Sequence, residues 1–108
     1  MRRARVLVHG EHAGRLTEIE RHRHFRFDYA GEYSGPPVSL TMPVREEPYE
    51  FSGFPSFFDG LLPEGIQLEG LLRLSKIDKD DLFAQLAAVG GDLVGAVTVE
   101  LLSDEASG

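Results

Sequence analysis

The sequence predicts an α+β domain: a small antiparallel sheet with an N-terminal hairpin and about three helices packed to one side. Three observations lead to this fold class. Segments with strand character occupy residues 4–30 and 95–101, segments with helix character lie within residues 54–90, and all six prolines fall within residues 36–63. A run of strands followed by a run of helices is typical of α+β folds.

The N-terminal third predicts a hairpin and a further strand. Residues 4–9 form a largely apolar run, residues 10–14 carry turn residues including two glycines, and residues 15–20 resume the apolar pattern, so we expect a β-hairpin. Residues 24–30 then alternate between aromatic and charged side chains. This period of two predicts a strand with one buried face, formed by Phe25, Phe27 and Tyr29.

The prolines predict an irregular middle segment. Each proline lacks an N–H donor, which excludes a continuous helix or a central strand over residues 36–63. We expect a loop with short extended pieces near Val38–Met42 and Tyr49–Phe51.

Three helical segments and a final strand complete the prediction. Residues 54–62 are densely apolar and predict a short helix, and Pro63-Glu64 suits the first turn of a second one. The third helix is predicted to begin after Asp78 as its N-cap and to end at Gly90-Gly91. With a strand over residues 95–101, residues 1–102 are expected to form one domain, and residues 103–108 a flexible tail.

Composition restricts the possible functions. The 108 residues include no cysteine, which excludes disulfides, thiolate metal sites and a cysteine nucleophile. No signal peptide or membrane-length apolar run is found, so we expect a cytoplasmic protein without membrane contact. The net charge is −7, although residues 1–26 hold seven arginines against three glutamates. The acidic remainder would repel phosphates, so direct nucleic-acid binding is not expected.

No pattern in the sequence indicates catalysis. His22 and His24 could begin a metal site, but no third ligand stands at a diagnostic spacing, so we expect no metal and no cofactor. The chain has neither a nucleophile elbow nor a glycine-rich phosphate loop. It also contains no kinase catalytic segment, and 108 residues are too few for a kinase core. The sequence therefore predicts a protein that is not an enzyme.

Three segments together carry a resemblance to a known family. They are the hairpin Val6–Leu16, the stretch Pro37–Val44 with its Ser-Leu-Thr-Met-Pro, and Phe57–Gly65, which reads Phe-Phe-Asp-Gly-Leu-Leu-Pro-Glu-Gly. Downstream, Asp81–Phe83 and Leu86–Ala96 continue the pattern. In this order and spacing, residues 4–101 resemble the N-terminal subdomain of HipA-type serine/threonine kinases.

The resemblance implies a role as a binding subunit. In the larger family this module is fused to a kinase toxin, whereas free-standing copies occur in HipBST-type toxin–antitoxin systems. There a HipS-like protein binds and restrains a HipT-like serine/threonine kinase, in company with a HipB-like helix-turn-helix protein. The resemblance therefore implies an antitoxin that inhibits a HipT- or HipA-like kinase. The alternative is a structural module or accessory subunit of such a kinase, without inhibitory activity of its own.

Two segments are predicted to contact the kinase. Phe58 and Leu62 are expected to be buried supports for an exposed tip, in which Ile66 would be an apolar plug. A second possible contact is the loop between prolines, with Ser39, Thr41 and Met42, although internal packing explains that loop equally well. The predicted tip consists of Asp59, Pro63, Glu64, Gly65, Ile66 and Gln67.

A function from a different class stays open. A small hydrolase or metal-dependent enzyme would have to use His22, His24 and nearby acidic residues. Metal analysis of the purified protein distinguishes the two classes, and we expect no stoichiometric metal.

Overall fold

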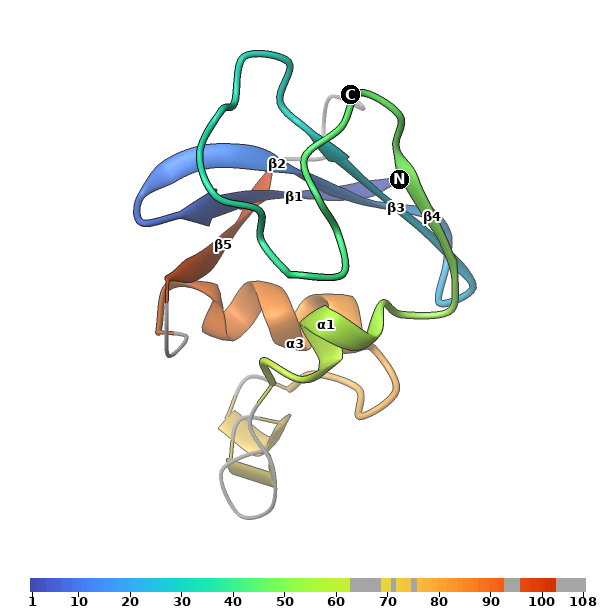
Figure 1. Cartoon of the computed structure of the whole chain (residues 1–108). Coiled ribbons are helices and arrows are strands. Elements are labelled where there is room, and N and C mark those ends of the chain that lie inside the picture. Colours follow the sequence, from blue (N-terminus) through green and yellow to red (C-terminus); the bar gives the residue numbers. More distant parts are fainter. Residues whose placement is uncertain (63–68, 71, 75, 93–95, 103–108) are drawn as a thin grey trace.

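A computed structural model describes residues 1–62, 69–70, 72–74, 76–92 and 96–102, and it has the predicted α+β fold. Within these residues, five antiparallel strands form one sheet in the order β4-β3-β2-β1-β5, and the helices lie on one side of it (Figure 1). The strands are β1 (Arg2–Val8), β2 (Glu11–Glu20), β3 (His24–Tyr29), β4 (Tyr49–Ser52) and β5 (Val97–Leu102). The helices whose bounds lie within the described residues are α1 (Ser56–Asp59), α3 (Leu82–Val89) and the 3-10 helix η1 (Gly90–Asp92).

The N-terminal hairpin is tighter than the sequence predicted. Its turn consists of His9 and Gly10, which both have positive φ, at 52° and 81°. Two successive residues with positive φ match the twist of a two-residue hairpin turn. Residues 11–14, predicted to be the turn, instead belong to β2, and an irregularity in the β1–β2 register falls beside Ala13. The prediction placed the turn on the glycines and missed the positive φ of a histidine.

The hydrophobic core fills the space between the sheet and the helices. Alternate residues of β3 point into it, as predicted, and Phe25 and Phe27 are almost completely buried. The Phe27 ring lies 5.9 Å from that of Phe58 in α1, and the Phe25 ring lies 6.5 Å from that of Phe83 in α3. The aromatic face of β3 therefore positions both helices against the sheet.

Helix α3 begins three residues later than predicted. The side chain of Asp81, and not that of Asp78, caps it by accepting a hydrogen bond from the backbone N–H of Ala84 at 3.2 Å. Asp78 instead accepts from the backbone N–H of Asp80 in the preceding turn. At the other end, Gly90 and Gly91 follow the helix as predicted, but both continue into η1.

Other predicted segments lie partly outside the described residues. The second helix was predicted from Pro63-Glu64 onward, and only residues 69–70 and 72–74 of that region are described, all of them helical. Strand β5 ends at Leu102, and the predicted tail, residues 103–108, is outside the described part. Within the described part, no helix is long and apolar enough to cross a membrane.

Candidate docking surfaces

The first predicted contact segment begins at the exposed end of α1. Phe58 is completely buried and Leu62 nearly so, which confirms that both are buried as predicted. Asp59 lies between them in sequence and is exposed. The other members of the predicted tip lie outside the described residues; they are Pro63, Glu64, Gly65, Ile66 and Gln67.

The second predicted contact segment is a tight turn over residues 39–42. The backbone N–H of Met42 donates to the carbonyl of Ser39 at 3.0 Å, and the two residues form an isolated β-bridge. The hydroxyl of Ser39 also accepts from the N–H of Thr41, and the two hydroxyls lie 2.9 Å apart. Ser39 is half-buried, Thr41 is exposed, and Met42 is buried. The Met42 side chain therefore belongs to the core and not to the surface of the turn.

The phenol of Tyr29 holds this turn from inside. Its hydroxyl accepts from the backbone N–H of Val38 at 3.0 Å and donates to the carbonyl of Met42, so it ties together the residues on both sides of the turn. Val38 and Met42 are 5% and 4% exposed and pack in the same core. In Figure 1 the teal-to-green loop between β3 and β4 carries this turn toward the side of the sheet on which α1 and α3 lie.

We expect Tyr29→Phe to destabilise the domain by about 1–3 kcal/mol, because it leaves the buried Val38 N–H and Met42 carbonyl without their shared partner. Urea unfolding followed by circular dichroism measures the loss. The matched control is Tyr49→Phe, because the Tyr49 hydroxyl donates to the carbonyl of Pro43 at an exposed site. It should cost less than about 0.5 kcal/mol. Equal effects of the two substitutions would show that the Tyr29 hydroxyl has no special role.

A cluster of charged side chains joins β1, β2 and α3. The guanidinium of Arg2 donates two hydrogen bonds to Glu18, at 2.7 and 2.8 Å, and two to Asp81, at 2.8 and 3.0 Å. Its Cζ atom also lies 5.0 Å from the ring centroid of Phe83. Glu18 and Asp81 are 4% and 8% exposed, so Arg2 bridges two carboxylates that are largely shielded from water. The exposed Arg21 also lies 3.9 Å from Asp81.

The same contacts determine how the two carboxyl groups titrate. Burial raises the pKa of Glu18, but the hydrogen bonds from Arg2 and from the backbone N–H of His22 outweigh it and leave this pKa below its usual value. The pKa of Asp81 is lowered in the same way, by Arg2 and by the N–H of Ala84 against the effect of burial. Both groups are therefore held in the charged form.

This cluster is also the place where a metal could be considered. Glu18, His22 and Asp81 each offer one atom that could bind a metal ion, and these three atoms lie within 4.8 Å of one another. However, Arg2 already satisfies both carboxylates, and a metal ion would have to displace its guanidinium. His24, the other member of the predicted histidine pair, instead contacts Glu50 in β4 at 2.6 Å. The two histidines thus contact different acids, and we continue to expect no stoichiometric metal.

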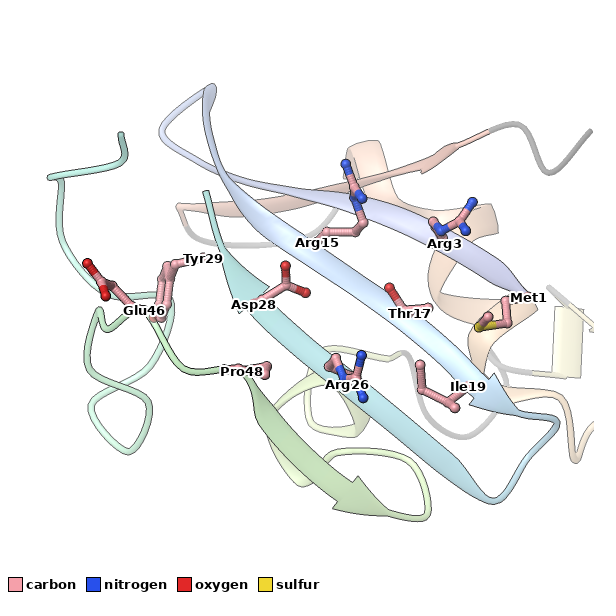
Figure 2. Close-up of a pocket in the computed structure, with 10 residues that line it drawn as sticks. All are labelled: Met1, Arg3, Arg15, Thr17, Ile19, Arg26, Asp28, Tyr29, Glu46 and Pro48. Atoms are coloured by element: carbon pink, nitrogen blue, oxygen red, sulfur yellow. The ribbon is translucent and has the colours of Figure 1, made fainter. Parts of the chain in front are cut away.

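The outer face of the sheet, opposite the helices, bears a concave charged surface (Figure 2). An open cavity of about 350 Å³ lies there. Arg3, Arg15 and Arg26 line it from three adjacent strands. Thr17 of β2 lies between Arg3 and Arg26, and Ile19 lies further along the same strand. Asp28 and Glu46 also line the cavity, and Arg26 is held by Glu50 at 2.8 Å. Such a wide, charged lining is suited to a polar segment of a protein partner and not to an enclosed small molecule.

Sequence reasoning missed two features of these surfaces. Arg2 was counted only as part of a basic N-terminus, because its carboxylate partners lie 16 and 79 residues away. Leu40 was not singled out, although its side chain is 96% exposed between the buried Val38 and Met42. No signal in the sequence distinguishes Leu40, since Val38 and Met42 are apolar residues of the same proline-bounded stretch and both are buried.

Comparison with known proteins identifies similar chains. The model of the family described as HipA N-terminal domain matches residues 4–100. A solved structure described as the N-terminal domain of HipA toxin superposes with a TM-score of 0.73 at 30% identity, covering 95% of this chain and 94% of that one. The agreement extends over nearly the full length of both chains.

Two curated proteins are also similar in sequence. A Haemophilus influenzae protein described as uncharacterized is 33% identical over 100 residues, which cover 93% of this chain and 92% of that protein. A Sinorhizobium fredii protein described as "Putative kinase Y4mE" is 32% identical over 92 residues. That match covers 82% of this chain but only 22% of the longer protein.

Proposed function

Because the chain belongs to the HipA N-terminal domain family, we propose that it is an antitoxin subunit that binds and inhibits a HipT- or HipA-like serine/threonine kinase. The proposal rests mainly on two of the matches, which cover very different shares of the matched proteins. The chain matches a HipA N-terminal domain along almost its whole length, and it matches 22% of a longer protein described as a kinase. In the longer protein, the matching segment is one part of a chain described as a kinase. A separate chain with the same fold is suited to dock onto a kinase core.

The contacts of the polar groups that the structure describes support a docking role. The hydroxyl of Ser39 is hydrogen-bonded within its own turn, and His24 is held by Glu50. The carboxylates of Glu18 and Asp81 are engaged by Arg2. These groups are thus held in structural contacts, while the exposed turn at residues 39–42 and the charged outer face of the sheet offer contact area to a protein.

The proposed inhibitory contacts start from α1. Phe58 and Leu62 anchor the end of α1 in the core, and Asp59 stands exposed between them. We propose that Asp59 and the residues predicted to follow it, Pro63 to Gln67, contact the kinase, with Ser39 and Thr41 as a second contact. We further propose a cytoplasmic complex that includes a HipB-like helix-turn-helix protein, which would contact DNA in place of this chain.

Co-expression tests the proposal. A HipT-like kinase from the same genome is produced alone and together with the tagged chain, and growth and pull-down are followed in the same cultures. We expect the kinase alone to arrest growth, and the chain to restore growth and to retain the kinase on the affinity resin. Kinase activity of the purified complex, measured by autophosphorylation, should be lower than that of the free kinase.

The other outcomes discriminate between the alternatives. A stable complex without restored growth would identify an accessory subunit and would refute the inhibitory role. Absence of a complex would refute the docking function altogether. A catalytically inactive kinase variant as bait is the control, because it separates binding from any effect of toxicity on expression.

A further inference from the structure

The turn at residues 39–42 presents one large apolar side chain to solvent. Leu40 is 96% exposed, the highest value among the exposed large hydrophobic residues of the described chain. Complete burial of a leucine is worth about 1.5–3 kcal/mol, and this domain does not use that free energy for its own folding. The same free energy is available to a partner that covers Leu40.

The backbone around Leu40 is held by contacts on both sides. The neighbouring Val38 and Met42 are buried, and the Tyr29 hydroxyl bridges their backbone groups. Inside the turn, the N–H of Met42 donates to the carbonyl of Ser39, and the Ser39 hydroxyl accepts from the N–H of Thr41. A leucine on a mobile loop would lose conformational entropy on binding. Here the backbone part of that entropy is already lost when the domain folds.

We infer that Leu40 is an apolar anchor that inserts into a hydrophobic pocket on the surface of the partner kinase. This inference rests on the proposed function and adds to it the surface used and the chemistry of the partner's site. The exposed hydroxyl of Thr41 and the half-buried one of Ser39 lie beside the anchor. They provide the polar rim that usually surrounds a desolvated anchor residue. The pocket on the kinase is therefore apolar at its centre, with hydrogen-bonding groups at its edge.

The test compares two leucines that are both exposed. Leu40→Ala and Leu40→Asp are measured beside Leu74→Asp, because Leu74 is 85% exposed but lies in the helical residues 72–74, away from the turn in sequence. None of the three substitutions removes a buried group, so the melting temperature should change by less than about 3 °C. The dissociation constant for the purified HipT-like kinase is measured by calorimetry.

We expect Leu40→Ala to weaken binding by about 10-fold and Leu40→Asp by more than about 100-fold, while Leu74→Asp changes it by less than about 2-fold. If Leu40→Asp binds within about 2-fold of the unaltered protein, the anchor is refuted and the antitoxin proposal stands. If Leu74→Asp weakens binding as much as Leu40→Asp, the turn is not the specific contact. If the unaltered protein does not bind the kinase, the proposed function fails, and this inference fails with it.

Discussion

Gly90→Ala is expected to lower the melting temperature by roughly 12–20 °C, the equivalent of about 3 kcal/mol in a domain of this size. A Cβ atom at position 90 would lie 1.9 Å from the carbonyl oxygen of Val99 and 2.8 Å from its carbonyl carbon. Both atoms belong to the backbone of β5, which also pairs with β1 and cannot move alone. Relief of the clash would therefore require α3 and η1 to move away from the sheet and to open the core around Phe83 and Leu86.

Gly91→Ala is the matched control for this prediction. No atom lies within 4 Å of a Cβ built at position 91, so the substitution should be neutral or slightly stabilising. Thermal unfolding followed by circular dichroism compares the two variants in the same buffer. A melting temperature of Gly90→Ala within about 2 °C of the unaltered protein would show that α3 and β5 do not pack as closely as the structure indicates.

The role of Gly90 shows what sequence patterns can and cannot predict. The pattern placed a glycine pair at the end of the third helix, and the helix does end at Val89. Glycines that end helices commonly adopt a left-handed conformation, but Gly90 has φ of −53° and a right-handed conformation. The physical reason is the close approach to β5, a contact between distant parts of the chain that local sequence does not encode.

Local periodicity predicted the strands well. The alternation of aromatic and charged residues over residues 24–30 corresponds to β3, whose aromatic face is buried in the core. The order of strands was not predictable in the same way, because β5 pairs with β1 across nearly the whole sequence. Pairing between the first and last strands depends on the packing of the complete domain and not on any one segment.

The candidate contact residues were predicted only in part. The motif around Ser-Leu-Thr-Met-Pro drew attention to residues 39–42, but it could not tell which side chains point inward. The hydrogen bonds of the Tyr29 hydroxyl determine the orientation, because they hold the backbone of Val38 and Met42 against the core. The side chains of these two residues are buried, and that of Leu40 is exposed. The two hydrogen bonds connect residues 9 and 13 positions apart, beyond the range of turn propensities.

Arg2→Met is expected to destabilise the domain by about 3 kcal/mol at pH 7, a large part of the total stability of a small domain. Methionine keeps an unbranched apolar stem beside Phe83 but removes the four hydrogen bonds to Glu18 and Asp81. Two largely buried carboxylates would then repel each other without the hydrogen-bonded counter-charge between them, and only the exposed Arg21, 3.9 Å from Asp81, would offset part of this repulsion. Because Asp81 also caps α3, the loss should extend to the N-terminal end of that helix.

Arg5→Met is the control for the loss of one positive charge from β1. Arg5 lies on the same strand, but its ion pair with Glu100 spans 3.7 Å between side chains that are 43% and 58% exposed. Exposed pairs of this kind contribute little, so the loss should stay below about 1 kcal/mol. Equal losses for the two variants in urea unfolding would show that Arg2 contributes only as a general surface charge.

The pH dependence gives the Arg2 prediction a second, independent signature. In the unaltered protein, the pKa values of Glu18 and Asp81 are lowered in the folded state, so the unfolded chain binds protons more readily. The stability from this cluster is therefore complete above the unfolded carboxyl pKa of about 4 and is lost as the pH falls through the folded values. In Arg2→Met, the effect of burial is no longer opposed by the guanidinium, so we expect both carboxyl pKa values to rise and protonation to favour the folded state. The difference in unfolding free energy between the two proteins should thus shrink from pH 7 to pH 4. A difference that stays constant over this range would mean that Arg2 acts through packing against Phe83 and not through the two carboxylates.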